Sequence, residues 1–254
     1  MSEHFEGRVA LVTGGAGGLG RATCEALIAA GARVLLVDVD EAAGLASAEA
    51  IGAEFFAADV SSFEQNQDMV AVATERFGGL DFVYLNAGLA TGFGVGDDFD
   101  LEAYRRVMGV NLDGVIFGTH AALPALDARG GGGIVATASL AGLTSVPMDP
   151  LYAANKHAVV GFARSLGPGL IDRGIRINAI CPGFAESRII DPIRDGLAEA
   201  GIPIIPAAKV AAAVLELFGG EMTGEAWFVQ PGRDAAAFEF RGIPGPREES
   251  ASAD

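Results

Sequence analysis

The fold is decided by residues 9–20, which read Val9-Ala10-Leu11-Val12-Thr13-Gly14-Gly15-Ala16-Gly17-Gly18-Leu19-Gly20. The first four residues are aliphatic and favour a buried strand, and a helical pattern begins at Leu19. Glycines between the two allow a tight turn and a close approach of backbone N–H groups to a bound group. At the positive end of a helix, such N–H groups favour a pyrophosphate. This order of elements therefore predicts a dinucleotide-binding domain.

An acidic residue closes the next apolar run. Val34 to Val37 is typical of a second strand, and Asp38 follows it directly. A carboxylate at this place accepts hydrogen bonds from the adenosine ribose hydroxyls and repels a 2′-phosphate. We therefore expect NAD rather than NADP as the cofactor. An ordinary exposed loop acid is the alternative interpretation of Asp38.

Short apolar runs alternate with longer helical patterns along the rest of the chain. We predict strands over residues 9–12, 34–37, 54–57, 82–85, 134–137, 175–180 and 227–229. We predict helices over residues 19–30, 63–77, 101–128, 151–171 and 207–218. The alternation predicts an α/β fold of the doubly wound Rossmann type, with a mostly parallel seven-stranded sheet and helices on both faces. Ligands in such folds bind beyond the carboxyl ends of the strands.

Length and composition fit one domain. The chain has 254 residues, of which 50% are apolar, and it contains no internal repeat and no interior linker. We expect residues 1–240 to form a single NAD-binding catalytic domain. Residues 241–254 are rich in Pro, Gly and Glu, which predicts a disordered tail.

The charge balance excludes some partners. A formal net charge of −16 disfavours nucleic acid and anionic membranes, because both carry negative charge. The first residues lack the basic and apolar regions of a signal peptide, and no apolar run is long enough for a membrane span. Cys24 and Cys181 are isolated, without metal-ligand spacing. We expect a cytoplasmic protein with neither a disulfide framework nor a metal site.

A second informative stretch is Tyr152-Ala153-Ala154-Asn155-Lys156, in a chain with only three tyrosines and two lysines. Residues four apart share one face of a helix, which places the phenol beside the ammonium. A neighbouring positive charge favours the phenolate and lowers a pKa that is ordinarily about 10. Tyr152 then becomes a usable proton donor or acceptor. The alternative is a Tyr/Lys pair on a helix surface.

Taken together, these residues resemble the short-chain dehydrogenase/reductase family, from about residue 7 to residue 232. The glycine turn matches the family's Thr-Gly-x-x-x-Gly-x-Gly pattern. Ser187 stands where the family commonly has a threonine that touches the nicotinamide carboxamide. The cofactor-binding residues that the resemblance implies are Gly14, Gly18, Leu19, Gly20, Asp38, Asp59, Val60, Asn86, Ala87, Gly88, Tyr152, Lys156, Pro182, Gly183, Phe184 and Ser187.

The resemblance also implies a catalytic tetrad of Asn111, Ser139, Tyr152 and Lys156. Tyr152 would exchange a proton with the substrate oxygen while hydride moves to or from the nicotinamide. Ser139 would stabilise the negative charge that develops on that oxygen. Lys156 would lower the tyrosine pKa and bind the nicotinamide ribose, and Asn111 would hold a water that links Lys156 to solvent.

The expected substrate is an apolar secondary alcohol or ketone, because the candidate pocket is apolar and no arginine is placed for a carboxylate or phosphate. Its candidate lining residues are Leu89, Phe93, Leu140, Val146, Met148, Phe184 and Ile189. The stretch over residues 178–184 is most similar to the 15-hydroxyprostaglandin dehydrogenase-like branch of the family, which implies oxidation of a lipid-like alcohol. A short segment between Gly183 and Ala207 predicts either a more open site or a smaller substrate.

Two other functions are alternatives. A 3-oxoacyl-carrier-protein reductase would use NADPH and a basic docking surface, which Asp38, Gly15 and the acidic balance disfavour. A cofactor-sensing binding protein would keep the fold without turnover, which the intact tetrad disfavours.

The resemblance implies a homotetramer or homodimer that uses the long helices as contact surfaces. Gly167-Pro168-Gly169 should kink or end one of these helices. Phe238 and Phe240 follow the last predicted strand and cover either a neighbouring subunit or their own.

Overall fold

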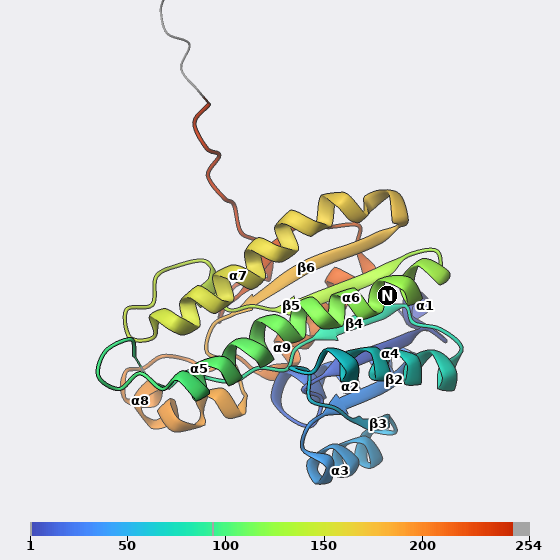
Figure 1. Cartoon of the computed structure of the whole chain (residues 1–254), viewed down its shortest axis with the longest axis horizontal. Coiled ribbons are helices and arrows are strands. Elements are labelled where there is room, and N and C mark those ends of the chain that lie inside the picture. Colours follow the sequence, from blue (N-terminus) through green and yellow to red (C-terminus); the bar gives the residue numbers. More distant parts are fainter. Residues whose placement is uncertain (1, 93, 246–254) are drawn as a thin grey trace, which may run out of the picture.

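A computed structural model describes residues 2–92 and 94–245 of the chain. One sheet lies between two layers of helices (Figure 1). The strand order is β3-β2-β1-β4-β5-β6-β7-β8, and neighbouring strands are parallel except for the β7–β8 pair. The predicted doubly wound α/β fold is therefore confirmed. Residues 241–245 are exposed and form no helix or strand, and the rest of the predicted tail lies outside the described residues.

The strands are β1 Val9–Thr13, β2 Arg33–Asp38, β3 Glu54–Ala57, β4 Phe82–Leu85, β5 Gly132–Thr137, β6 Ile175–Pro182, β7 Ala226–Val229 and β8 Ala236–Ala237. The α-helices are α1 Ser2–Phe5, α2 Gly18–Ala29, α3 Glu41–Ile51, α4 Phe63–Phe77, α5 Leu101–Met108, α6 Gly114–Ala128, α7 Pro150–Leu166, α8 Arg194–Glu199 and α9 Ala207–Gly219. A π-helical turn, η1, spans Gly109–Asp113, and the 3₁₀ turns are η2 Leu140–Gly142, η3 Gly167–Arg173 and η4 Arg188–Ile193. Within the described part of the chain, no helix is both long and apolar enough to span a membrane.

The sheet is buried on both faces. Successive residues of a strand point to opposite faces, and β1 shows this plainly: Leu11 packs in the core beneath α4, α6 and α7, whereas Ala10 and Val12 pack in the core beneath α2 and α9. All five residues of β1 are buried. This double burial explains why the strands appear in the sequence as continuous apolar runs.

The structure has eight strands, not the predicted seven. The additional strand, β8, is two residues long and pairs antiparallel with β7 at the edge of the sheet. A two-residue strand leaves no periodic pattern in the sequence. Helix α3 was missed for a related reason, because its Ala-rich sequence lacks an apolar stripe. Its available signals were the end residues: Asp40 Oδ1 accepts from Ala43 N, and Gly52 ends the helix with a φ of 76°.

The helix predicted over residues 101–128 is not continuous. It is divided into α5 and α6 by the π-helical turn η1. Glycines on both sides let this turn approach the loop after β3 closely, since a Cβ on Gly109 would lie 3.2 Å from Ser61 Cβ and one on Gly114 would lie 2.9 Å from Val60 Cγ2. π-Helical turns of this kind are often found at functional sites. Asn111 lies within it.

The predicted interruption of the helix that carries Tyr152 is confirmed. Helix α7 ends at Leu166, and the 3₁₀ turn η3 follows from Gly167. A Cβ on Gly167 would lie 2.5 Å from Gly224 N, so only glycine lets the chain pass this close to the segment that leads into β7.

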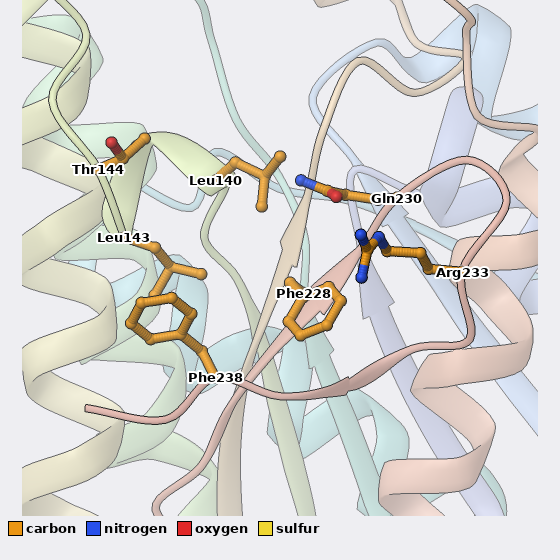
Figure 2. Close-up of a pocket in the computed structure, with 7 residues that line it drawn as sticks. All are labelled: Leu140, Leu143, Thr144, Phe228, Gln230, Arg233 and Phe238. Carbon is orange, nitrogen blue, oxygen red and sulfur yellow. The ribbon is translucent and has the colours of Figure 1, made fainter. Parts of the chain in front are cut away.

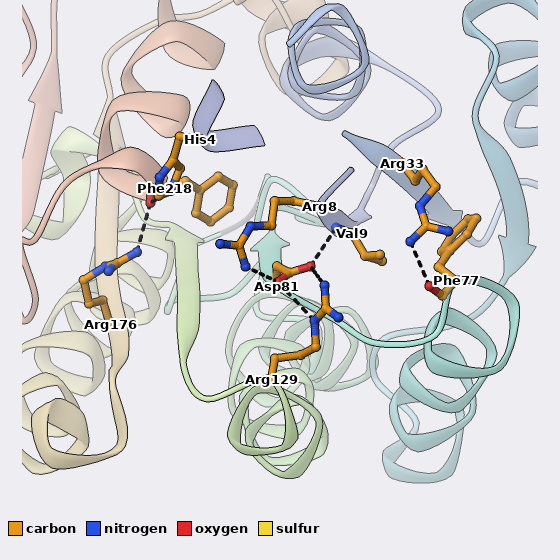
Figure 3. A network of polar contacts seen from close by, with 9 residues as sticks. All are labelled: His4, Arg8, Val9, Arg33, Phe77, Asp81, Arg129, Arg176 and Phe218. Atoms are coloured by element: carbon orange, nitrogen blue, oxygen red, sulfur yellow. Dashed lines mark hydrogen bonds and ion pairs between the residues drawn. The ribbon is translucent and has the colours of Figure 1, made fainter. Parts of the chain in front are cut away.

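A buried carboxylate ties β1, β4 and α6 together at the amino-terminal edge of the sheet (Figure 3). Asp81 is 2% exposed and accepts hydrogen bonds from Val9 N at 2.9 Å, Arg8 Nη1 at 2.8 Å and Arg129 Nη2 at 2.9 Å. Burial by itself would raise the pKa of Asp81, but the donors of Arg129, Val9 and Arg8 outweigh it and hold that pKa below its ordinary value.

We expect the Asp81→Asn variant to lose about 3 kcal/mol of unfolding free energy at neutral pH, because two guanidinium groups lose their buried counter-charge. A depressed folded-state pKa gives stability that is present above the unfolded pKa and lost as the pH falls through the folded value. The difference between wild type and variant should therefore close in acid. Urea unfolding at a series of pH values measures it.

The matched control is Glu25→Gln, which removes an exposed ion pair with Arg21 on α2. This variant should lose only about 0.3 kcal/mol of unfolding free energy. Equal losses in the two variants would show that Asp81 contributes no more than a surface charge.

Candidate active site

The glycine turn between β1 and α2 is closely packed. Gly14 and Gly18 have φ values of 63° and 50°, which favour glycine. A Cβ on Gly20 would collide with the carbonyl oxygen of Gly14. Leu19 is buried beneath the turn, and α2 starts at Gly17 without a capping side chain. The first N–H groups of α2 are thus available to a bound anion.

Asp38 holds this turn against the end of β2. Its Oδ2 accepts from Ala16 N at 3.0 Å, and its Oδ1 accepts from Asp40 N at 3.1 Å. Gly15 N also donates to Val37 O at 3.0 Å. The residue is partly buried and hydrogen-bonded, so it is not an ordinary exposed loop acid. A carboxylate has about four acceptor sites, and Asp38 retains acceptor capacity for a ligand beside the turn.

Asp59 and Val60 follow β3 and lie beneath the start of α6. Asp59 Oδ1 accepts from Ser61 N at 2.9 Å and from Ser61 Oγ at 2.7 Å, which folds the carboxylate onto its own loop. Val60 is buried, and its carbonyl accepts from Asn66 Nδ2 at 2.8 Å. These bonds fix the loop next to the carboxyl ends of β1 and β4.

Asn86, Ala87 and Gly88 connect the glycine turn to the tetrad. Asn86 N and Ala87 N both donate to Thr13 Oγ1, at 2.9 and 3.1 Å. Thr137 Oγ1 donates to Asn86 Oδ1 at 3.2 Å. Thr13 opens the glycine pattern in the sequence, but Thr137 was not among the predicted residues, although both end strands at the carboxyl edge, where polar side chains indicate a site.

Asn111 is fully buried in the π-helical turn η1. Its Oδ1 accepts from Leu89 N at 2.7 Å, and its Nδ2 donates to Leu89 O at 2.9 Å. A Cβ on Gly88 would lie 3.4 Å from Asn111 Oδ1 and 3.8 Å from Lys156 Nζ. The turn therefore brings Asn111 into the tetrad region, while its side-chain amide is occupied by the backbone of Leu89.

Lys156 is 2% exposed, so the alternative of a surface Tyr/Lys pair is wrong. Its Nζ donates to Thr137 O at 2.9 Å and lies 5.7 Å from the centre of the Tyr152 ring. Both side chains project from one face of α7, as the four-residue spacing predicts. Burial lowers the pKa of Lys156 to about 8.

The pKa of Tyr152 differs from the sequence-based expectation. Burial raises it to about 12, while a hydrogen bond with Ser139 lowers it in part and the charge of Asp149 raises it further. The expected lowering by Lys156 is therefore wrong for this structure. The physical reason is that burial disfavours the phenolate, and the ammonium of Lys156 is bonded to Thr137 O instead of the phenol.

Ser139 lies two residues after the end of β5 and is the N-cap of the 3₁₀ turn η2. Its Oγ accepts from Ala141 N at 3.1 Å. Asp149 caps α7 by accepting from Tyr152 N at 2.9 Å, which sets the first turn of that helix. The two caps bring the hydroxyls of Ser139 and Tyr152 to the same place at the carboxyl edge of the sheet.

Pro182, Gly183, Phe184 and Ser187 form the base of the segment after β6. Gly183 N donates to Val229 O at 3.0 Å, which holds the segment beside β7. Phe184 is 42% exposed, and Ser187 Oγ donates to Ala185 O at 3.1 Å. A Cβ on Gly18 would lie 3.1 Å from Ser187 Cα, so this segment packs on the glycine turn.

The two ends of this segment are joined by a parallel bridge between Ala185 and Ile205. The part between them forms η4 and α8, which the sequence analysis did not predict. Their apolar residues Ile190 and Leu197 are buried. The segment is therefore folded, with two short helical elements that pack on the rest of the chain.

A cavity of about 290 Å³ lies next to the turn that begins at Ser139 (Figure 2). It is lined by Leu140, Leu143, Thr144, Phe228, Gln230, Arg233 and Phe238. Of the candidate lining residues, Leu140 is among these, Met148 is 92% exposed elsewhere, and Phe93 lies outside the described residues. Arg233 lines this cavity, whereas the sequence indicated no arginine near a pocket.

The segment after β8 packs on its own chain. Phe238 lines the cavity beside Leu143, and the guanidinium of Arg164 on α7 lies 3.5 Å from the ring centre of Phe240. Both phenylalanines contact their own chain and each stays 37% exposed, so both interpretations of them stay predictions.

Comparison with known proteins agrees with this geometry. Residues 8–198 match the family model for short chain dehydrogenases. The 15-hydroxyprostaglandin dehydrogenase [NAD(+)] of Homo sapiens is 38% identical over 202 residues, which cover 75% of this chain and 73% of that protein. The cyclohexanol dehydrogenase of Acinetobacter sp. (strain SE19) is 36% identical over 196 residues, or 75% of this chain and 78% of that protein. The crystal structure of levodione reductase matches with a TM-score of 0.83 at 33% identity, covering 89% of this chain and 97% of that one.

The fold and the site define a nucleotide-binding oxidoreductase of the Rossmann type. The chain belongs to the short-chain dehydrogenase family. It acts as an oxidoreductase on CH–OH groups.

We expect Gly20→Ala to destabilise the protein by about 2 kcal/mol, a magnitude typical of overpacking. The added methyl group would collide with Gly14 O and lie 2.9 Å from Asn86 Nδ2. Gly17→Ala is the matched control, because a Cβ there would meet only Arg188 Nε, at 3.8 Å. Chemical denaturation of both variants measures the difference, and equal stability would contradict the close packing described for the turn.

Proposed function

We propose that the protein is an NAD-dependent dehydrogenase that interconverts an apolar secondary alcohol and its ketone, with Tyr152 as general acid and base. The observation that carries this proposal is the burial of Lys156 beside Tyr152 and Ser139, at the sheet edge where the glycine turn also lies. A charged side chain is rarely buried without a use or a partner.

The residues present fit NAD. The uncapped start of α2 can bind a pyrophosphate, and Arg188 Nε lies near Gly17 to add a positive charge. Asp38 has acceptor capacity for ribose hydroxyls and would repel a 2′-phosphate. Relatives that are named as using NAD(+) support the same choice. When bound, NAD⁺ supplies the acceptor for the hydride that leaves the alcohol carbon.

In the direction of oxidation, Tyr152 takes the proton of the substrate hydroxyl in its phenolate form, which the charge of Lys156 must favour against the effect of burial. In reduction, the protonated phenol returns it. The hydroxyl of Ser139 donates a hydrogen bond to the substrate oxygen and stabilises its developing negative charge. The buried ammonium of Lys156 uses one of its three donors on Thr137 O, which leaves two for ribose hydroxyls and for charge stabilisation at the phenol.

The cavity beside Leu140 supports an apolar substrate, because four of its seven lining residues are Leu or Phe. The names of two relatives, a hydroxyprostaglandin and a cyclohexanol dehydrogenase, describe activity on hydroxyl groups of molecules with large apolar parts. A homodimer or homotetramer stays a prediction that light scattering can test.

We expect Tyr152→Phe to lower kcat about 10³-fold, within the range for a lost general acid or base. NADH affinity should change little, because the ring and its packing remain. The matched control is Tyr104→Phe, which removes the hydroxyl of a tyrosine on α5 outside the site. Turnover of a secondary-alcohol panel is followed at the nicotinamide absorbance. Unaltered kcat in Tyr152→Phe would exclude the proposed proton transfer.

We expect Asp38→Asn to shift cofactor choice toward NADPH by at least about tenfold, or about 1.4 kcal/mol. Removing the charge ends the repulsion of a 2′-phosphate, and the amide makes a poorer partner for two ribose hydroxyls. Titration with NADH and NADPH measures the ratio of the dissociation constants. Glu49→Gln on α3 makes the same change of charge and serves as control. An unchanged ratio in Asp38→Asn would overturn the assignment.

A further inference from the structure

A second cavity of about 240 Å³ lies at the opposite, amino-terminal edge of the sheet (Figure 3). It is lined by His4, Arg8, Asp81, Phe82, Arg129, Gly130, Gly131, Gly132, Gly174 and Arg176. These residues surround the starts of β1, β4, β5 and β6. The five residues of β1 rise about 17 Å in total, so the length of a strand separates this cavity from the candidate active site.

The cavity is positively charged within an acidic protein. Three guanidinium groups, those of Arg8, Arg129 and Arg176, line it together with a single carboxylate, that of Asp81. Arg8 and Arg129 both bond to Asp81, whose depressed pKa keeps it negative near neutral pH. The lining charges therefore sum to about +2, in a chain whose net charge is −16.

Arg176 has unused donors in this cavity. Its Nη2 donates to Phe218 O at 3.0 Å, but its Nε is buried and has no hydrogen-bond partner among the described residues. Burial lowers the pKa of Arg176, and the charge of Glu221 opposes this only in part. A buried donor without an acceptor costs about 1–3 kcal/mol, and more for a charged group. That nitrogen is closed to solvent, so an anion in the cavity would bond to the other donors of the guanidinium.

The other two arginines are held in place with donors left over. Arg129 uses Nε and Nη2 on Asp81, at 3.2 and 2.9 Å, and Arg8 uses one Nη1 hydrogen on the same carboxylate. The bonds to Asp81 orient both guanidinium groups before a ligand binds, which reduces the conformational entropy lost on binding.

Glycines let the backbone pack closely at this edge of the sheet. A Cβ on Gly132 would collide with Asp81 O, and a Cβ on Gly131 would collide with Gly174 O. Gly131 and Gly174 also have φ values of 127° and 65°. Glycine at these positions therefore lets the segments that line the cavity approach one another closely.

We propose that this cavity binds a phosphate group, as inorganic phosphate or as a small phosphate ester, at a site separate from the active site. A tetrahedral dianion matches a charge of about +2 and presents acceptors in several directions, whereas a carboxylate presents them in one plane. One water occupies about 30 Å³ of liquid, so the cavity has room for a phosphate with some hydration and is too small for a nucleotide. The inference does not depend on the proposed dehydrogenase activity.

The test is calorimetric titration of the full chain with inorganic phosphate, in a buffer free of other oxyanions and with NADH present to occupy the glycine turn. We expect saturable binding of one phosphate per chain. Arg176→Gln and Arg8→Gln should each weaken it at least tenfold. Arg176→Lys, which keeps the charge but loses the planar fork, should give an intermediate loss. The control Arg194→Gln, in an exposed pair with Asp191, should bind as the wild type does.

Two further ligands identify the source of the phosphate. Glycerol phosphate binding as tightly as inorganic phosphate indicates an ester site, and tighter binding of inorganic phosphate indicates the free ion. Acetate should bind far more weakly than either. No saturable binding in the NADH-saturated protein, or equal affinity in wild type and both Gln variants, would overturn the proposal. Arg8 is 48% exposed, so its variant tests the idea even where Arg176→Gln unfolds, which circular dichroism reveals.

Discussion

The hydrogen bonds that meet at Asn86 are the constraint on which the rest of the site depends. Its backbone N–H bonds to Thr13 at the end of β1, and its side-chain oxygen accepts from Thr137 at the end of β5. The carbonyl of Thr137 in turn accepts from Lys156. An unbroken set of bonds therefore links the glycine turn to the buried lysine. Because buried bonds of this kind are costly to break, the glycine turn and the buried Lys156 are parts of one frame.

Burial sets the electrostatics of this frame. It raises the pKa of Tyr152 and lowers the pKa of Lys156, so both shifts favour the neutral forms. Charges that develop next to these groups interact strongly, because little water is present to screen them. In the proposed reaction, that environment makes the charge of the lysine and the hydrogen bond of Ser139 effective at the substrate oxygen.

The two edges of the sheet carry different groups of residues. The carboxyl edge carries the glycine turn before α2, Asn111 in the π-helical turn η1, and Tyr152 and Lys156 on α7. The amino edge is held by Asp81 and its arginines, which contribute to stability and also create a cationic cavity. The strands between the two edges are buried on both faces, so the same two cores position both edges.

The sequence by itself determined the doubly wound fold, because strands buried on both faces must be apolar throughout and the glycine turn must follow the first of them. It also determined that Tyr152 and Lys156 share a helix face, since a four-residue spacing admits little else. Only the tertiary structure decided the rest. The π-helical turn at Asn111 depends on how closely glycines approach another loop, and β8 exists only because β7 is there to pair with it. The direction in which the pKa of Tyr152 shifts depends on burial, which residue spacing does not encode. Arg233 lines a cavity only because the chain turns back toward the sheet after β7.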